Sequence, residues 1–349
     1  MNVINPHVFD PIHALVLLGV TAAATALLIQ LLHPLLVRYA LARPNARSSH
    51  TIPTPQGGGI PIVITVLAVV IAGAVLGQGP RPATAIAMMV VGLAMLAIAG
   101  AIDDIHPLPV LPRLIVQLSA AALMVLTFPA EARLFPFLNL LIERTLLVVG
   151  LVWFINLTNF MDGIDWMTVA ETVPIAACLA ALGLTGLVSE LTPLLPVVLA
   201  LLGGMLGFAP FNRHVARLFL GDVGSLPIGA LVGWLLIVLA LAGHLIAALI
   251  LPLYYLADAT ITLIRRWRNG ENIGEAHRSH FYQRATSGGF SVPQVTRDVF
   301  ALNVLLAVLS VAAVKSPVAM TRFACLALAI VATLAVLWRF GNGAPEQRI

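Results

Sequence analysis

The chain has 349 residues, of which 60% are hydrophobic and only 10% are charged. An ordinary soluble domain has about 25% charged residues, and a folded chain of this size exposes too much surface to be covered by so few polar side chains. A water-soluble fold is therefore excluded. The apolar segments are continuous rather than alternating, which also excludes a transmembrane β-barrel. The composition predicts an all-α polytopic membrane protein.

Uncharged runs predict about eleven transmembrane helices of about 20 residues each. They lie at 14–36, 60–79, 83–102, 114–130, 145–161, 172–189, 191–211, 223–243, 245–264, 299–314 and 323–338. The length leaves room for one integral-membrane domain, residues 1–349, and for no large soluble one. The N-terminus lacks a basic n-region with a small-residue cleavage site, so the sequence predicts no removable signal peptide. Both cysteines lie inside apolar runs, so it predicts no disulfide framework.

The distribution of basic residues predicts the orientation. With eleven helices, the loops after the odd-numbered helices and the C-terminal tail share one side of the membrane. This side has 14 of the 19 Lys and Arg residues, and the other side has 5. The positive-inside rule makes the first side cytoplasmic, with the N-terminus periplasmic and the C-terminus cytoplasmic.

The same cytoplasmic loops hold most of the acidic and histidine residues outside the helices. Polar residues gathered on one membrane face indicate a site on that face. The alternative is that these loops are merely solvated. Their sequences are specific rather than generic Lys/Glu filler, which favours the site.

The loop after the first helix reads RSSHTIPTPQGGGI, from Arg47 to Ile60. Gly57 and Gly58 lack Cβ atoms, so their backbone N–H groups can approach an anion. Taken alone, the segment is equally consistent with a Gly/Pro turn between two helices.

Two adjacent acids, Asp103 and Asp104, follow an uncharged run of twenty residues. The C-terminal end of a helix is already its negative pole and disfavours acids. A divalent cation or a proton would relieve the repulsion between the two carboxylates. We therefore favour a metal-phosphate role over a pair of solvated acids.

The segment NLTNFMDGID presents four polar residues at helical spacing. Asp162 and Asp165 are three residues apart, and Asn156 and Asn159 repeat this spacing one turn earlier. Such a stripe predicts ligand contact. A helix N-cap would account for only one of the four.

The sequence GDVGS places Asp222 between glycines immediately before an apolar helix. Backbone amides at a helix N-terminus bind phosphate, and Asp222 could hold a cation beside it. The alternative is a simple capping aspartate.

The last long cytoplasmic loop contains HRSHFYQR, with four phosphate donors in eight residues: His277, Arg278, His280 and Arg284. Arginine makes bidentate contacts with phosphate. Two histidines alone are a weak zinc signal, so phosphate binding is the stronger hypothesis.

Together these loops predict phosphoryl chemistry on an anionic substrate at the cytoplasmic surface. No P-loop is present, so ATP hydrolysis of that type is not supported. A transporter or flippase for an anionic lipid or sugar is the main alternative. It requires charged residues buried at mid-membrane, for which Asp258 is the candidate. An inactive scaffold is disfavoured by the retained acids.

The motifs PTPQGGG, the DD pair, NFMDGID, FLGDVGS and HRSHFYQR together resemble the polyprenyl-phosphate N-acetylhexosamine-1-phosphate transferases, of the glycosyltransferase family 4 type. The resemblance implies transfer of an N-acetylamino-sugar 1-phosphate from a UDP-sugar, GlcNAc first, to undecaprenyl phosphate, with UMP released. It implies Mg²⁺, with Mn²⁺ as an alternative, and location in a bacterial inner membrane. The partners implied are these two substrates and the lipid bilayer, with no nucleic acid, and a homodimer is left open.

The resemblance also implies roles for individual residues. Asp103 and Asp104 would lie by the lipid phosphate, one of them as a base, and Asp222 would bind Mg²⁺ together with Asp103. Asn156 and Asp162 would contact the nucleotide, and Phe219 would stack on uracil. The loop after the first helix lacks a lysine, and HRSHFYQR replaces a triple-histidine ending. Both departures disfavour a muramoyl-pentapeptide substrate and resemble the branch that initiates O-antigen and capsule.

Overall fold

A computed structural model describes residues 10–42, 53–76, 83–272 and 277–343. Part of the loop after the first helix, including Arg47, lies outside the described residues, as do Arg81, Glu275 and Arg348.

The described chain is almost entirely helical. Its helices are α1 Pro11–Tyr39, α2 Gly59–Val75, α3 Ala83–Ile105, α4 Val110–Val125, α5 Leu140–Met161, α6 Met167–Leu184, η1 Ser189–Leu194, α7 Leu195–Asn212, α8 Asp222–Leu239, η2 Ala240–His244, α9 Leu245–Ile250, α10 Leu253–Arg268, α11 Phe281–Ser287, α12 Val292–Lys315 and α13 Ala319–Gly341. The two short strands, β1 Leu41–Ala42 and β2 Thr54–Pro55, pair antiparallel.

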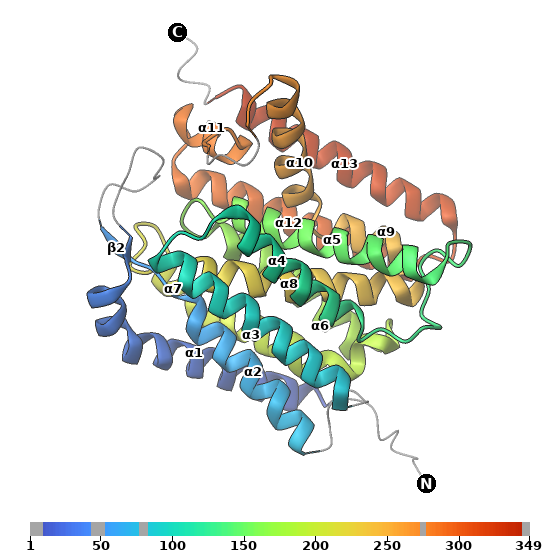
Figure 1. The fold of residues 1–349 in the computed structure, drawn as a ribbon. Helices are drawn as coiled ribbons and strands as arrows, with labels where there is room; N and C mark the ends of the chain where they lie inside the picture. Colours follow the sequence, from blue (N-terminus) through green and yellow to red (C-terminus); the bar gives the residue numbers. More distant parts are fainter. Residues whose placement is uncertain (1–9, 43–52, 77–82, 273–276, 344–349) are drawn as a thin grey trace.

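The long helices form one bundle in which α7 and α8 are central. Helix α7 packs on α1, α2 and α6, and α8 packs on α3 and α5. In Figure 1 most helices run side by side from the upper left to the lower right, while α10 stands steeply across α5 and α12. Chain connections that are far apart in sequence therefore meet at the same end of the bundle.

One end of the bundle, called here the site end, is where α1, α3, α5 and α7 finish and the next helix begins. Backbone hydrogen bonds join its loops: Phe219 N–H donates to the Pro55 carbonyl, and Gly59 N–H donates to the Leu220 carbonyl. The Tyr282 hydroxyl donates to the Phe160 carbonyl at 3.0 Å. The sequence prediction that these loops share one face is thus consistent with the fold.

Eight described helices are long and apolar enough to cross a membrane, and two shorter apolar helices, Gly59–Val75 and Val110–Val125, lie among them. The chain is therefore a polytopic helical membrane protein. The sequence prediction of eleven continuous spans is not reproduced as such, because 245–264 is not one helix. Pro252 has no N–H for the helical ladder, and the chain breaks there into α9 and α10.

Polar capping residues shift several boundaries from those predicted by apolar runs. Helix α5 begins at Leu140 and not at 145, because the Asn139 side chain accepts from Leu141 N–H at 2.8 Å. Helix α12 begins at Val292 and not at 299, because Ser291 and Gln294 form a capping box. Hydropathy marks where the membrane core lies, whereas capping marks where the helix starts.

Small residues bring α2, α3 and α8 into backbone contact. A Cβ atom on Gly59 would collide with the Gly224 backbone, and one on Gly100 would collide with the Asp222 carbonyl. The start of α8 is therefore held against two helices by contacts that only glycine permits.

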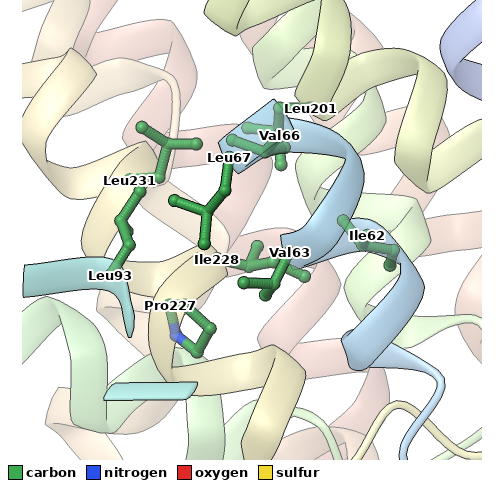
Figure 2. A pocket seen from close by; sticks show the side chains of 9 residues that line it. All are labelled: Ile62, Val63, Val66, Leu67, Leu93, Leu201, Pro227, Ile228 and Leu231. Atoms are coloured by element: carbon green, nitrogen blue, oxygen red, sulfur yellow. The ribbon is translucent and has the colours of Figure 1, made fainter. Parts of the chain in front are cut away.

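The bundle interior contains a small apolar gap between α2, α3, α7 and α8. Figure 2 shows that it is lined by aliphatic side chains and Pro227, and no charged side chain lies on it. Such a surface cannot bind a sugar nucleotide, which needs polar partners. The gap belongs to the packing of the core.

We predict that Gly59→Ala destabilises the protein by about 1–3 kcal/mol, because the added methyl group overpacks the contact with Gly224. Gly150→Ala is the control, since nothing lies within 4 Å of its Cβ position in the exposed face of α5. Helix propensity should make that variant neutral or more stable by up to about 1 kcal/mol. Melting temperatures in detergent test the pair. Equal shifts would contradict the packing argument.

Candidate active site

The N-terminus of α8 is capped by an aspartate from another helix. The Asp104 carboxylate, at the end of α3, accepts from Asp222 N–H at 2.9 Å and from Val223 N–H at 3.1 Å. These are two of the unsatisfied donors that begin every helix, and the positive end of the helix dipole favours an anion there. Gly221 has φ 76°, and a Cβ on it would strike the Asp104 carboxylate. Asp104 therefore fixes where Asp222 lies.

Asp103, the neighbouring acid, faces a different partner. Its carboxylate accepts from Leu108 N–H at 2.6 Å and from the Arg113 guanidinium at 3.2 Å. Arg113, near the start of α4, was not singled out from the sequence, although it lies only ten residues after Asp103. This ion pair links the end of α3 to α4, and the guanidinium partly compensates the negative charge of Asp103.

Asp222 lies between α3 and α5. Its carboxylate accepts from the Asn159 side-chain amide at 2.6 Å, and Asn159 also donates to the Ser225 hydroxyl at 2.9 Å. The carboxyl groups of Asp103 and Asp222 are in side-chain hydrogen-bond contact. Two facing carboxyl groups require a shared proton or a cation between them. The structure thus brings Asp103, Asp104, Asp222 and Asn159 together.

This pair of acids fits a Mg²⁺ ion. Among the described residues no group of three or more His, Cys, Asp or Glu side chains is placed to hold a metal. Mg²⁺ is commonly bound by one or two carboxylates, with water and substrate phosphates completing the octahedron. Asp103 and Asp222 supply that donor set, whereas a structural zinc site would need four ligands.

Asn156 lies one turn back on α5 and contacts α4. Its side-chain amide donates to Gln117 Oε1 at 2.7 Å and to the Val152 carbonyl at 2.8 Å. Gln117 is buried, and its amide nitrogen has no hydrogen-bond partner among the described residues. Asn156 therefore bonds to α4, whereas Asn159, which the sequence placed on the same stripe, bonds to Asp222. Its predicted contact with the nucleotide stays a prediction.

Asp162 caps the end of α5 and accepts from the Thr168 hydroxyl at 2.5 Å. Burial, together with the negative charges of Asp104 and Asp165, raises the pKa of Asp162 to about 7, although the Thr168 hydrogen bond acts to lower it. Gly163 follows because the Tyr282 hydroxyl occupies the space of a Cβ atom. Asp162 therefore lies where the α5–α6 connection meets the His-rich segment.

Asp165 turns away from the acid cluster. Its carboxylate contacts His214 Nδ1 at 2.7 Å and accepts from Ala216 N–H at 3.1 Å. It thereby fixes the α7–α8 connection. The three-residue spacing in the sequence predicted a shared face with Asp162, but the helix ends at Met161, so helical periodicity does not apply beyond it.

The glycine-rich segment packs against the start of α8. Gly58 N–H donates to the Phe219 carbonyl at 2.8 Å, and Gly57 has φ 105°. Because that amide is already bonded, Gly58 serves close packing in this structure and does not present a free N–H. Phe219 is half-buried beside the same segment. Substrate contact by Gly57, Gly58 and Phe219 stays a prediction.

The segment HRSHFYQR is anchored by Asp258 of α10. This fully buried carboxylate accepts from Phe281 N–H at 2.9 Å and Tyr282 N–H at 3.2 Å, and it contacts His280 Nδ1 at 3.2 Å. Asp258 thus caps α11, much as Asp104 caps α8. The sequence indicated only an acid in an apolar run, because the α11 residues that it caps are more than twenty residues away.

The four predicted phosphate donors of that segment face different ways. His280 is buried against Asp258. The ring centroids of His277 and His280 are 4.9 Å apart. Burial and the nearby His280 and Arg266 lower the pKa of His277 to about 4. Arg278 is exposed. Arg284 donates to the Gly341 carbonyl at 3.1 Å, at the end of α13, so here it joins helices and does not point toward the acids.

Glu171 is a buried acid that the sequence analysis missed. It lies on α6 with 3% exposure and accepts from the Asn303 side-chain amide at 2.7 Å. Asn303 belongs to α12, so the pair joins two helices within the bundle. Its only sequence signal was a single acid near the start of an apolar run.

The family model for glycosyl transferase family 4 matches residues 86–240, which include all four clustered side chains. A Bacillus subtilis protein named probable undecaprenyl-phosphate N-acetylglucosaminyl 1-phosphate transferase is 28% identical over 262 residues, covering 72% of this chain and 71% of the relative. A decaprenyl-phosphate N-acetylglucosaminephosphotransferase of Mycolicibacterium smegmatis is 28% identical over 378 residues, covering 96% and 92%. A phospho-N-acetylmuramoyl-pentapeptide-transferase of Streptococcus pneumoniae matches only 23% of the chain, at 41% identity.

We predict a pH-dependent stability difference for Asp162→Asn. The raised pKa of Asp162, about 7 against an ordinary 3.8, means that the folded state binds its proton more tightly than the unfolded state. The wild-type protein therefore loses stability through this group as the pH rises from about 4 through 7. Asparagine keeps an acceptor for Thr168 and does not ionise, so the melting temperature of the variant relative to wild type should increase between pH 5 and pH 8. Glu190→Gln, at an exposed carboxylate, is the control. A pH-independent difference would contradict the assignment.

Proposed function

Because the chain belongs to glycosyl transferase family 4, we propose that it transfers a sugar 1-phosphate from a nucleotide sugar to a polyprenyl phosphate. The single observation that carries the proposal is the acid cluster at the start of α8, formed by Asp103, Asp104 and Asp222. Relatives named for this activity align over most of both chains.

The proposed reaction is a phosphoryl transfer. A phosphate oxygen of the lipid attacks the β-phosphorus of a UDP-sugar, a new P–O bond forms, and the bond to UMP breaks. The products are a polyprenyl-diphospho-sugar and UMP. Such a reaction needs positioning and charge stabilisation more than covalent help from the protein.

The geometry supports separate roles for the acids. Both carboxylate oxygens of Asp104 accept hydrogen bonds from the α8 amides, so we assign Asp104 a structural role in positioning α8. Asp103 and Asp222 are in side-chain contact with one another and are the residues that would hold Mg²⁺. When bound there, the ion would neutralise charge on the diphosphate. Asn159 positions Asp222 through the 2.6 Å hydrogen bond.

The membrane arrangement that we propose has eleven crossings. Gly243 has φ 89° and ψ 8°, so the chain turns between α8 and α9. His244 lies close to Arg322 and Glu190 at the end opposite the acids, whereas Asp258 of α10 lies at the site end. Helices α9 and α10 together therefore return across the bundle as one broken span. The distribution of basic residues supports a cytoplasmic site end, and we propose a bacterial inner membrane as the location.

The transporter alternative is not favoured by the buried acids. Asp258 accepts hydrogen bonds from the α11 backbone, and Glu171 is held by Asn303. Both carboxyl groups are engaged in joining helices of the bundle. Neither acid lines the apolar gap between α2, α3, α7 and α8.

We propose the particular sugar and lipid from the names of the relatives. GlcNAc is the first sugar to test, followed by GalNAc and 6-deoxy-HexNAc sugars, and undecaprenyl phosphate is the first lipid. The product would initiate a cell-surface polysaccharide such as O-antigen or another lipopolysaccharide component. A homodimer stays open.

We predict that Asp222→Asn lowers turnover by about 10²–10³-fold, because the change removes a charge needed to stabilise the reacting diphosphate. Asp103→Asn should be similarly severe. Release of UMP from UDP-GlcNAc, in the presence of Mg²⁺ and undecaprenyl phosphate, measures the effect. Glu190→Gln is the control for loss of a surface carboxylate and should keep full activity. Near wild-type turnover of both Asp variants at saturating Mg²⁺ would exclude the proposed site.

The eleven-crossing arrangement predicts the side of two connections. Reporter fusions after Gly270, following α10, should give a cytoplasmic signal, and fusions after Ser316, between α12 and α13, should give a periplasmic one. A fusion after Phe340 should again be cytoplasmic. A periplasmic signal at Gly270 would reject the broken ninth span.

A further inference from the structure

Apart from the apolar gap, a polar hollow lies between the end of α7 and the start of α6. Its lining excludes every residue of the α8 acid cluster. Leu206 and Pro210 of α7 supply apolar lining, and Arg213, His214 and Arg217 supply cationic or polar lining. Trp166 completes it. The lining is thus amphipathic, with aliphatic, aromatic and basic groups in one concave surface.

Trp166 is held in this hollow by an unusual backbone conformation. It has φ 67° and is the only non-glycine residue of the described chain with positive φ. A bulky residue in this region costs about 1–3 kcal/mol, and such strain persists where the surroundings determine it. Here Trp166 N–H donates to Asn212 Oδ1 at 2.7 Å, and its indole N–H donates to the Ala209 carbonyl at 2.8 Å. The indole is therefore positioned in advance on the wall of the hollow.

The charge of the hollow is positive. Neither Arg213 nor Arg217 forms an ion pair within the described residues, and both are exposed. The guanidinium of Arg217 lies over the Phe211 ring, 5.6 Å from its centroid, and donates to the Pro210 carbonyl at 3.5 Å. The nearby acid, Asp165, is already bonded to His214 and Ala216. Two guanidinium groups remain to face an external anion.

The position along the bundle indicates where that anion comes from. Leu206 is 40% exposed on the membrane-crossing helix α7, and Val215 is 63% exposed in the loop that follows it. Apolar side chains beside arginines at the end of a transmembrane helix are typical of headgroup depth. A water-soluble anion would gain nothing from Leu206 and Val215, whereas a lipid would bury both.

We propose that this hollow binds the phosphate headgroup of an anionic phospholipid from the surrounding leaflet. Arg213 and Arg217 would bind the phosphate oxygens, since guanidinium groups match phosphate geometry. Trp166, Leu206 and Val215 would contact the glycerol and the first acyl carbons. The inference does not rest on the proposed transferase reaction.

One segment, residues 162–166, borders the hollow and also carries Asp162, whose carboxyl is affected by the charge of Asp104. Residues 162–166 contribute Asp162 on the side of Thr168 and Tyr282, and Asp165 and Trp166 on the side of the hollow. A lipid that contacts Trp166 would therefore also stabilise the α5–α6 connection, which positions Asp162.

Binding of phosphatidylglycerol to delipidated full-length protein in detergent tests the proposal, with native mass spectrometry as the readout. Arg213→Gln/Arg217→Gln should weaken the affinity about 30-fold, because each arginine near an anionic headgroup contributes about 1 kcal/mol. Arg268→Gln/Arg297→Gln removes the same charge from exposed positions at the site end and should change affinity less than twofold. Equal weakening by both double variants would overturn the site.

Two further arms separate the sources of the anion. Phosphatidylglycerol with brominated acyl chains should quench wild-type fluorescence more than that of Trp166→Phe, and the Arg213→Gln/Arg217→Gln variant should lose the quenching with Trp166 intact. Inorganic phosphate at the same concentration should not displace the lipid. Displacement by phosphate alone would make this a free-anion site, and equal binding of phosphatidylcholine would remove the role of charge. Either result would overturn the proposal.

Discussion

The contact between the Asp104 carboxylate and the first amides of α8 is the constraint on which the site depends. It joins the end of α3 to the start of α8 and satisfies donors that would otherwise be unpaired. It also decides which way Asp222 faces, toward Asp103 and Asn159. The glycines at 59, 100 and 224 make the contact possible, since larger residues would push α8 away from α2 and α3. Asp104, which the sequence predicted to be catalytic, is thus the residue that positions the proposed metal-binding pair, Asp103 and Asp222.

The same device recurs at the other long connection. Asp258, buried on α10, accepts from the amides that begin α11 and holds His280. Each of the two carboxylates lies near the end of an apolar segment and caps a helix far along the chain. Buried carboxylates are tolerated when several donors surround them, and removal of the donors would leave an uncompensated charge. At the site end of the bundle, buried carboxylates therefore hold separate helices together. This structural role supports a site built from loops rather than a path through the membrane.

Lipid and substrate would meet this protein at two neighbouring surfaces. The acid cluster faces the connection after α3, and the basic hollow faces the side of α7, with residues 162–166 between them. The strained Trp166 marks the second surface, because a glycine would adopt the same conformation without cost. The tryptophan side chain also donates its indole N–H to the Ala209 carbonyl, a bond that glycine could not form.

Composition and local pattern determined the class of fold, the polytopic helical arrangement and the five loops that carry polar residues. They could do so because apolar length and charge asymmetry are local properties of the chain. The motifs also identified Asp103, Asp104, Asp222 and Asn159, which the structure brings together. Only the tertiary structure showed that Asp165 turns away from that cluster, because helical spacing predicts a shared face only while the helix continues, and α5 ends at Met161. The tertiary structure also showed that Asn156, within α5, bonds to Gln117 of α4. It alone revealed Arg113, Glu171 and the anchoring role of Asp258, because each of these depends on a partner from another helix or loop, and sequence proximity does not reveal which partner the fold supplies.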